Sequence, residues 1–157
     1  AIRRQRQMCI RDRENSSAYA ILFIVSIILV ARRSLMDINA FWDATLKQDA
    51  NAMRAFFNDT AYINWHCTNE HFTVDEFIRA NCEYPGKWDG TIERIEHIGS
   101  LVITVVNVFA ISRELSFHVV SFINVNNGKI DSIDEYWGDD GLAPQWRLDK
   151  KIGSAIR

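Results

Sequence analysis

Apolar residues recur at three- and four-residue spacing from Asp37 onward, which is the pattern of a helix with one buried face. The pattern breaks at Asp49-Ala50-Asn51, where Asp49 or Asn51 is expected to cap a second short helix. The next segment, from Thr60 to Cys67, alternates loosely and is rich in β-forming residues. This region therefore predicts two helices followed by a strand.

A third helix and a series of strands complete the pattern. Thr73 and Glu76 have the spacing of a capping box, so a helix is expected to begin there and to end before Pro85-Gly86. Short turns, among them Asn127-Gly128, separate the strand-like runs, and such short links require antiparallel neighbours. The runs are Trp88–Ile98, Leu101–Ile111, Leu115–Val125 and Lys129–Trp137. This order predicts an α+β fold with helices on one face of a bent antiparallel sheet.

Charged residues are unevenly distributed along the chain. Residues 1–35 have a net charge of +5, whereas residues 36–157 have a net charge of −7. An acidic region without basic clusters is a poor candidate for binding a phosphate backbone, so no nucleic-acid partner is expected. Cys9, Cys67 and Cys82 form neither an even framework nor a Cys-x-x-Cys pair, which suits thiols in the reducing cytoplasm.

Residues 1–35 form an N-terminal extension with three interpretations. Residues 18–31 are apolar and follow Arg-rich sequence, so they fit an export signal or membrane anchor, although about 20 residues are needed to span a bilayer. The string QMCIRDR resembles translated sequencing-adapter sequence, in which case the extension is an artefact and the native chain begins at Met36. The third interpretation is a structural helix. In each case we expect one domain, residues 36–157.

Three segments carry a resemblance to a known superfamily. They are FWDATLKQDANAMRAFFNDTAYINWH, FTVDEFIRA and NGKIDSIDEYWGDD, in that order. Together they resemble the opening helices, third helix and closing strand of the nuclear transport factor 2-like superfamily, in particular its SnoaL-like group. The resemblance implies a curved antiparallel sheet whose N-terminal helices form a cone-shaped cavity, often in a homodimer. Relatives include polyketide cyclases, ketosteroid isomerases, dehydratases and non-catalytic binding proteins, and fold does not choose among them.

Three side chains on the last two strands are candidates for acid–base catalysis. Strand alternation places Asp134 and Tyr136 on one face, where a carboxylate in an apolar cavity can remove a proton beside a carbonyl and a phenol can donate to the resulting oxyanion. His118 lies in the preceding strand and is of a residue type that titrates near neutral pH. The alternatives are a solvated carboxylate with a rim tyrosine, and a core or interface histidine.

Aromatic side chains are candidates for lining the cavity, because indole rings supply a large rigid apolar surface with one N–H donor each. The alternative for these tryptophans is ordinary core packing. Trp146 and Arg147 could fold over the opening as a lid, and His66 could hydrogen-bond a ligand. The candidate ligand-binding residues are His66, Trp65, Trp88, Trp137, Trp146 and Arg147. Trp42, on the first helix, is assigned to the core.

The function expected from these observations is the binding of a small apolar, partly oxygenated ligand. If the protein is an enzyme, we expect cofactor-free isomerisation, cyclisation or dehydration. No nucleotide-binding loop, nucleophile elbow or zinc-protease motif occurs, and the spacing of His66, Cys67 and His71 fits no standard zinc site, so neither a metal nor a cofactor is expected. The alternative is a non-catalytic dimeric binding or scaffold module that uses the outer sheet face. A membrane partner is expected only if residues 18–31 are genuine.

Overall fold

The compact unit of the chain begins at Asp37, in a computed structural model that describes residues 36–156. The three interpretations of residues 1–35, including those of the apolar segment 18–31, concern a part of the chain outside the described residues. Within residues 36–156, no helix combines the length and the apolar character needed to cross a membrane.

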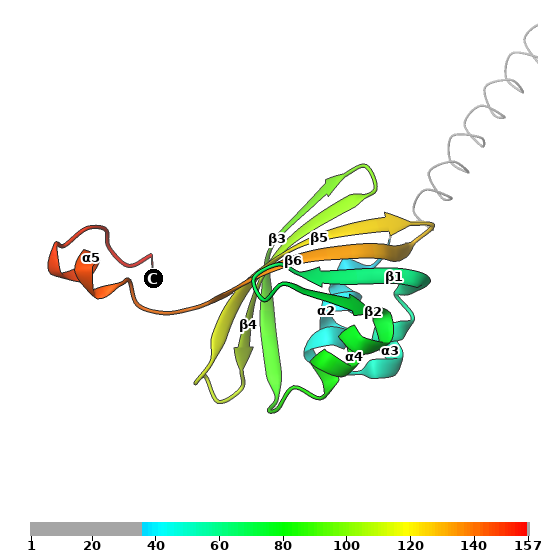
Figure 1. Ribbon diagram of the computed structural model, residues 1–157, viewed down its shortest axis with the longest axis horizontal. Coiled ribbons are helices and arrows are strands. Elements are labelled where there is room, and N and C mark those ends of the chain that lie inside the picture. Colours follow the sequence, from blue (N-terminus) through cyan, green and yellow to red (C-terminus); the bar gives the residue numbers. More distant parts are fainter. Residues whose placement is uncertain (1–35, 157) are drawn as a thin grey trace, which may run out of the picture. The chain divides into compact units, whose positions relative to one another are not determined.

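Apart from the short C-terminal helix, the helices of the described residues gather on one face of a curved sheet, as the α+β prediction requires (Figure 1). The elements in chain order are α2 (Ile38–Leu46), α3 (Ala50–Arg54), β1 (Phe57–Trp65), β2 (Glu70–Thr73), α4 (Val74–Cys82), β3 (Trp88–Ile98), β4 (Leu101–Ala110), β5 (Ser116–Asn126), β6 (Lys129–Asp139) and α5 (Gln145–Asp149). The sequence pattern missed the short strand β2, and it started β1 three residues too late.

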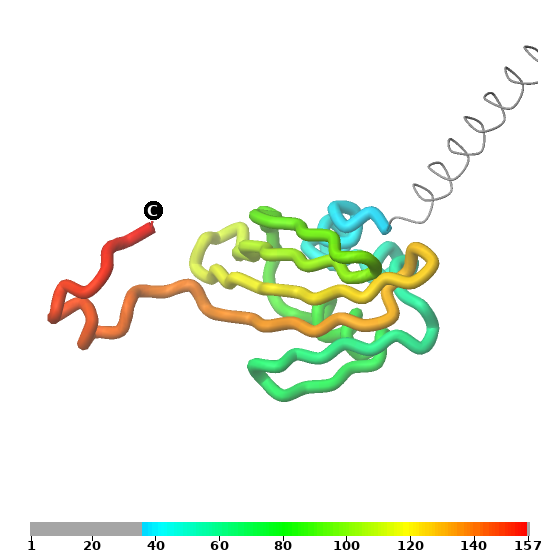
Figure 2. Tube along the Cα trace, turned by 90° about the horizontal axis from the view of Figure 1, so that it is seen from above, coloured from blue at the N-terminus to red at the C-terminus, as the bar shows by residue number. Residues whose placement is uncertain are grey.

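The six strands have the order β2-β1-β6-β5-β4-β3. Strands β3 to β6 form the predicted antiparallel meander, with close to the predicted bounds. The pairing of β1 with β6 is parallel, so the predicted curved antiparallel sheet contains one parallel junction within the described residues. On one side β1 pairs with its sequence neighbour β2, but on the other it lies beside β6, the last strand of the meander, to which no tight turn connects it. Figure 2 shows β6 lying between β5 and β1.

Local sequence signals fix the ends of several elements. Asn127 and Gly128 have φ angles of 51° and 78°, so both adopt the left-handed conformation that a two-residue hairpin turn between β5 and β6 demands. Of the two candidate caps for α3, the Asp49 side chain makes the bond, accepting from the Ala52 N–H at 3.0 Å. The predicted capping box of α4 is also present: the Thr73 N–H donates to Glu76 Oε2 at 2.8 Å, and the Glu76 N–H donates to Thr73 Oγ1 at 3.4 Å.

The core between the helices and the sheet is rich in aromatic rings. Phe41 packs edge-on against Phe57 at 5.9 Å between ring centroids, and Phe57 packs in the same way against Phe77 at 5.8 Å. The approach of α2 to β3 depends on Gly90, because a Cβ there would lie 3.0 Å from the Leu46 side chain. The fully buried side chains include Phe41, Trp42, Met53, Phe57, Ile63, Phe77, Val106, Val119, Ile123, Ile130, Ile133 and Glu135.

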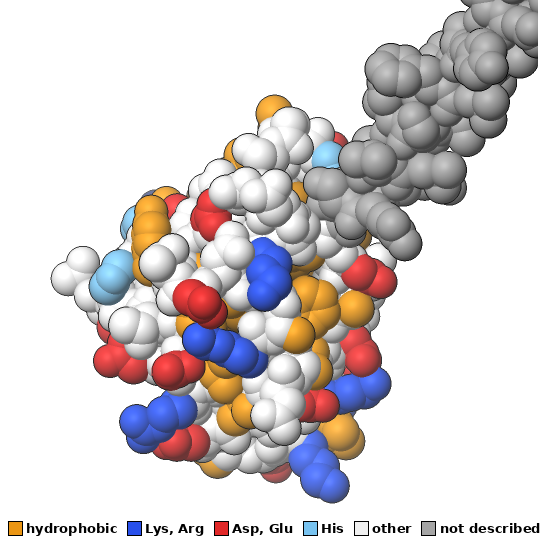
Figure 3. Space-filling view, turned by 90° about the vertical axis from the view of Figure 1, so that its right-hand side faces the viewer, with side chains coloured by type: hydrophobic (Ala, Val, Ile, Leu, Met, Phe, Trp, Pro, Cys, Tyr) orange, Lys and Arg blue, Asp and Glu red, His pale blue; other side chains and the backbone are white. Residues whose placement is uncertain are grey.

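Charged side chains of both signs are interspersed on the face shown in Figure 3, with hydrophobic side chains between them. Several opposite charges are paired, for example Lys47 with Asp43 at 2.8 Å and Arg79 with Glu83 at 2.8 Å. These are exposed pairs one helical turn apart, so solvent screens them and each stabilises its helix only weakly. The view in Figure 3 contains no extended patch of a single sign.

Candidate functional site

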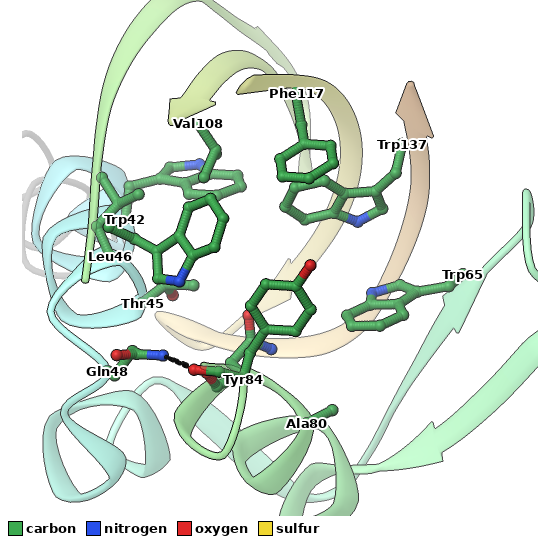
Figure 4. Close-up of a pocket in the computed structure, with 12 residues that line it drawn as sticks. Trp42, Thr45, Leu46, Gln48, Trp65, Ala80, Tyr84, Val108, Phe117 and Trp137 are labelled. Atoms are coloured by element: carbon green, nitrogen blue, oxygen red, sulfur yellow. Dashed lines mark hydrogen bonds between the residues drawn. The ribbon is translucent and has the colours of Figure 1, made fainter. Parts of the chain in front are cut away.

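A pocket of about 350 Å³ lies between the helices and the inner face of the sheet. This volume is at the small end of the range of about 300–1,000 Å³ that is usual for ligand sites. Figure 4 shows the labelled rings of Trp65, Tyr84, Phe117 and Trp137 arranged around a common space. The lining residues are Trp42, Thr45, Leu46, Gln48, Trp65, Ala80, Asn81, Tyr84, Trp88, Val108, Phe117 and Trp137.

Five aromatic side chains of the wall form a continuous chain of ring contacts. Tyr84 contacts Trp88 at 5.3 Å between centroids, and Trp88 contacts Phe117 at 5.8 Å. Phe117 contacts Trp137 at 6.4 Å, and Trp137 contacts Trp65 at 6.1 Å. These separations lie in the favourable range for tilted and edge-to-face aromatic pairs. The rings therefore hold one another in place, and the pocket wall is preorganised for binding.

The indole N–H groups of the wall are hydrogen-bonded within the protein. Trp42 Nε1 donates to Thr104 Oγ1 at 3.2 Å, and Trp88 Nε1 donates to the Pro85 carbonyl at 3.2 Å. These bonds fix the rotation of each ring and leave its carbon surface for contact with a ligand. The tryptophans thus supply apolar area and ring faces, with their N–H donors already in use.

The other two indoles of the wall share one buried acceptor, Glu135. This side chain is 1% exposed, and its Oε2 accepts from Trp65 Nε1 at 2.7 Å and from Trp137 Nε1 at 3.0 Å. Its Oε1 accepts from Ser121 Oγ at 2.8 Å. Burial raises the pKa of Glu135, because it penalises the charged form, and the three hydrogen bonds oppose this only in part. A carboxylate therefore lies directly behind two rings of the pocket wall.

The polar groups at the pocket wall are few, and no Asp, Glu, His, Lys or Arg is among the lining residues. Gln48 Nε2 donates to the backbone carbonyls of Asn81 and Tyr84, both at 2.8 Å, and the second of these bonds is drawn in Figure 4. Thr45 Oγ1 donates to the Phe41 carbonyl at 2.9 Å. Gln48 thus joins the connection after α2 to the last turn of α4 and the segment that follows it.

The structure brings three of the predicted ligand-binding residues together in the pocket, namely Trp65, Trp88 and Trp137. His66 is not a lining residue. Its Nε2 lies 2.8 Å from Asp134 Oδ1, and its ring stacks on that of Tyr136 at 4.6 Å between centroids. These three side chains lie on the outer face of the sheet.

Asp134 and Tyr136, the predicted catalytic pair, point away from the pocket because of a bulge in β6. Val125 pairs with Ile130 but Asn124 pairs with Ser132, so Asp131 is an extra residue. The side chains of β6 that face the core are Ile130, Ile133, Glu135 and Trp137. Burial on its own would raise the pKa of Asp134, but hydrogen bonds from Asn64 and His66 outweigh it and hold this pKa below its usual value.

His118, the other predicted catalytic residue, also lies outside the pocket. Its Nδ1 is hydrogen-bonded to Asp140, and its Nε2 lies 3.4 Å from Glu93 Oε2. The Asp140 carboxylate raises the pKa of His118, and the charge of Glu93 acts in the same direction. With both ring nitrogens facing carboxylates, His118 has the environment of a paired surface histidine.

The predicted lid residues, Trp146 and Arg147, lie in α5 and do not line the pocket. Trp146 is 58% exposed, and the Arg147 guanidinium carbon lies 5.9 Å from the centre of its ring. Asp140, which precedes α5 in the chain, is hydrogen-bonded to Ser116 and His118.

Sequence reasoning missed several residues of the site. Trp42 was assigned to the core and is indeed 2% exposed, but it also lines the pocket. Tyr84 and Gln48 lie in connections between elements, where periodicity gives no signal. Glu135 did leave a signal, since it alternates with Ile133 and Trp137 and so shares the core-facing side of β6 with two large apolar residues.

No group of three His, Cys, Asp or Glu side chains within residues 36–156 is arranged to hold a metal ion. His71 Nδ1 lies 2.8 Å from Asn64 Oδ1, and His66 is held by Asp134. The thiol of Cys82 lies 3.3 Å from the Gln48 carbonyl, and burial raises its pKa.

Comparison with known proteins gives matches of structure only. No protein-family profile matches the chain, and no curated protein sequence matches it. A candidate ketosteroid isomerase from Kribbella flavida aligns with a TM-score of 0.63 at 19% identity, over 76% of this chain and 86% of that one. A nuclear transport factor 2-like protein of unknown function from Burkholderia xenovorans aligns with a TM-score of 0.62 at 24% identity, over 76% and 92%.

A third solved structure is a hypothetical protein with a ketosteroid isomerase-like fold from Catenulispora acidiphila, in complex with trimethylamine. It aligns with a TM-score of 0.53 at 14% identity, over 63% of this chain and 82% of that one. At these identities the likeness establishes the fold and leaves the function open.

Proposed function

We propose that this chain, which has the nuclear transport factor 2-like cone fold, is a binding protein for a small, mainly apolar ligand. The observation that carries the proposal is the wall of six aromatic side chains around a cavity of about 350 Å³. Burial of apolar ligand surface against such a wall is favourable by roughly 25 cal/mol per Å². The ring contacts that hold the wall in place reduce the cost of ordering it on binding.

Binding is favoured over catalysis because the lining residues include no acid, base or activated nucleophile apart from the Tyr84 phenol. Proton-transfer catalysis needs a titratable group within hydrogen-bond reach of the substrate. The polar side chains that do reach the wall, Thr45, Gln48 and Asn81, already donate to backbone carbonyls, and their oxygen atoms suit recognition of a ligand hydroxyl group. The ligand is therefore apolar over most of its surface and oxygenated at one end.

The proposal is tested by isothermal titration with two probes, benzene and p-cresol, whose hydroxyl reports on the polar groups of the wall. Ala80→Phe places a ring in the pocket, whereas Ala55→Phe makes the same change at an exposed position. Both probes should bind the wild type and Ala55→Phe, and neither should bind Ala80→Phe. Equal binding to all three proteins, or no binding to the wild type, would refute a ligand site in this pocket.

A second candidate function is proton-transfer catalysis with Glu135 as the base. The observation that favours it is a buried carboxylate with a raised pKa directly behind the pocket wall. Access to a substrate requires the indoles of Trp65 and Trp137 to move aside, since both are bonded to Glu135. If this candidate holds, Glu135→Gln abolishes turnover of a bound ligand while leaving its affinity similar; turnover that survives the change excludes it.

The oligomeric state is a separate proposal, that of a homodimer formed through the outer sheet face. Its support is the exposure of Tyr62 and Tyr136, at 43% and 45%, on that face of β1 and β6. Sedimentation analysis of the wild type and Tyr136→Lys tests this proposal. A wild-type dimer that Tyr136→Lys weakens would support an interface on the outer sheet face, whereas a wild-type monomer at all concentrations would reject the homodimer.

A further inference from the structure

The aromatic rings of the pocket wall can attract a positive charge as well as an apolar surface. The faces of aromatic rings carry partial negative charge, so a cation placed over them is attracted, most strongly by tryptophan. Four of the six wall rings are indoles, contributed by Trp42, Trp65, Trp88 and Trp137. Because no Lys, Arg or His is a lining residue, no positive side chain of the wall competes for these faces.

From this arrangement we infer that the pocket recognises an organic cation with a methylated ammonium group. The inference rests on the proposed function, that the pocket binds a small ligand, and it names the class of that ligand. Such a group is apolar in its outer surface and positive in charge, so it matches an aromatic wall in both respects.

We infer that the ammonium group is methylated because of the hydrogen bonds that an unmethylated one would need. A primary ammonium has three N–H donors, each of which needs an acceptor once it leaves water. The wall has no carboxylate of its own, and its neutral polar side chains are Thr45, Gln48, Asn81 and Tyr84. A fully methylated nitrogen has no N–H to satisfy, so it loses little by entering this site.

Glu135 provides the counter-charge for such a ligand. Its carboxylate is separated from the cavity by Trp65 and Trp137, and its three hydrogen-bond donors are two indoles and one hydroxyl, all of them neutral. A carboxylate that accepts from an indole N–H also pushes electron density into that ring, which strengthens the attraction of its face for a cation. A cation in the pocket and the ionised form of Glu135 therefore favour each other.

Basic side chains beside the pocket are partly neutralised. Lys47 follows the lining residue Leu46 and is paired with Asp43, and Arg79 precedes Ala80 and is paired with Glu83. The net charge of −7 over residues 36–157 adds a field that attracts cations.

The inference is tested with choline and its uncharged carbon analogue, in which a tert-butyl group replaces the trimethylammonium group. The two probes have the same shape, so the hydrophobic effect alone favours the analogue. Isothermal titration should show choline binding more tightly by on the order of tenfold, and Ala80→Phe should abolish binding of both.

Two neighbouring substitutions on β6 separate the local role of Glu135 from the overall charge. Glu135→Gln and Asp134→Asn each replace one carboxyl group with an amide, but Asp134 lies on the outer face. Glu135→Gln should remove most of the preference for choline without changing the affinity of the analogue, whereas Asp134→Asn should leave both unchanged. Trp65→Phe, which keeps a ring but weakens its attraction for a cation, should weaken choline binding several-fold more than analogue binding.

The possible failures are distinguishable. If benzene and the carbon analogue bind and choline binds no more tightly than the analogue, the cation inference is overturned and the proposed function stands. If none of the three binds the wild type, both fail. A choline preference that Glu135→Gln leaves intact overturns the role assigned to Glu135, and choline binding that survives Ala80→Phe places the cation elsewhere and overturns the inference.

Discussion

The Trp65 indole donates to the Glu135 carboxylate at 2.7 Å, and the two residues pair with each other across the parallel strands β1 and β6. The bond joins a ring of the pocket wall to a fully buried acid. Trp137 donates to the same oxygen, so a single carboxylate sets the orientation of two wall rings. The one parallel junction of the described sheet is thus also the place where the wall is fixed.

Replacement of Glu135 by an apolar residue should destabilise the fold strongly. Glu135→Leu leaves the two indole N–H groups and the Ser121 hydroxyl without their acceptor, and each unsatisfied buried group costs about 1–3 kcal/mol. We expect the free energy of unfolding, measured with urea, to fall by at least about 3 kcal/mol.

Glu135→Gln is the control for that loss, because the amide keeps the size of the side chain and can still accept from both indoles. Its free energy of unfolding should stay within about 1 kcal/mol of the wild-type value at neutral pH. Equal destabilisation by the two substitutions would contradict the assigned hydrogen-bonding role.

Stability should also depend on pH through Glu135. Burial raises the pKa of Glu135 in the folded state above its ordinary value of 4.5, so the folded protein holds this proton more tightly than the unfolded chain. The contribution to stability is fully present below the ordinary value and is lost as pH rises through the folded-state pKa. The difference in unfolding free energy between wild type and Glu135→Gln should therefore fall as pH rises above 4.5 and through the folded-state pKa of Glu135. A difference that is constant across this range would contradict the raised pKa.

The stabilisation that the His118–Asp140 pair contributes should have a bell-shaped dependence on pH. Asp140 raises the pKa of His118, and this stabilisation is lost as pH rises through the folded-state pKa of the histidine. Burial on its own would raise the pKa of Asp140, but hydrogen bonds from Ser116 and His118 outweigh it and lower this pKa. The stabilisation from the ionised Asp140 is therefore lost as pH falls through its folded-state pKa. The pair is partly exposed, so His118→Asn should cost less than about 1 kcal/mol, most of it at mildly acidic pH.

Probe binding supplies the second readout for His118. Because this side chain lies outside the pocket, His118→Asn should leave the affinity for benzene unchanged. A tenfold loss of affinity for benzene would contradict this prediction and indicate that His118 takes part in binding.

Gly90 should be sensitive to a single added methyl group. The Cβ of Gly90→Ala would lie 3.0 Å from the Asn107 carbonyl oxygen and from the Leu46 side chain, so α2 and β3 must separate. Overpacking of this kind costs about 1–3 kcal/mol, and it also displaces Leu46, which lines the pocket. Gly141→Ala is the matched control, since its Cβ meets no atom within 4 Å. Urea unfolding of both variants checks the prediction, and equal stabilities would contradict it.

Much of the fold follows from local patterns. The capping box at Thr73 and the Asn127-Gly128 turn were both readable from the sequence, because each depends on residues close together in the chain. The parallel pairing of β1 with β6 was not, since it joins segments about seventy residues apart without any turn to mark it.

The predicted catalytic pair Asp134 and Tyr136 lies outside the pocket because of one residue. The bulge at Asp131 reverses the alternation in β6, so a parity count from Ile130 puts Asp134 in the cavity and Glu135 outside. Counting from Trp137 instead gives the observed arrangement. The sequence did identify Trp65, Trp88 and Trp137, because their size suits a cavity wall whichever way the count runs.

The most direct test of the central claim is nuclear magnetic resonance of the wild-type protein with benzene. We predict nuclear Overhauser effects between benzene protons and the ring protons of Trp65 and Trp137, which line the pocket, and none to Trp146, which is 58% exposed in α5. The absence of contacts to Trp65 and Trp137, or contacts to Trp146 alone, would contradict a ligand site inside the cone.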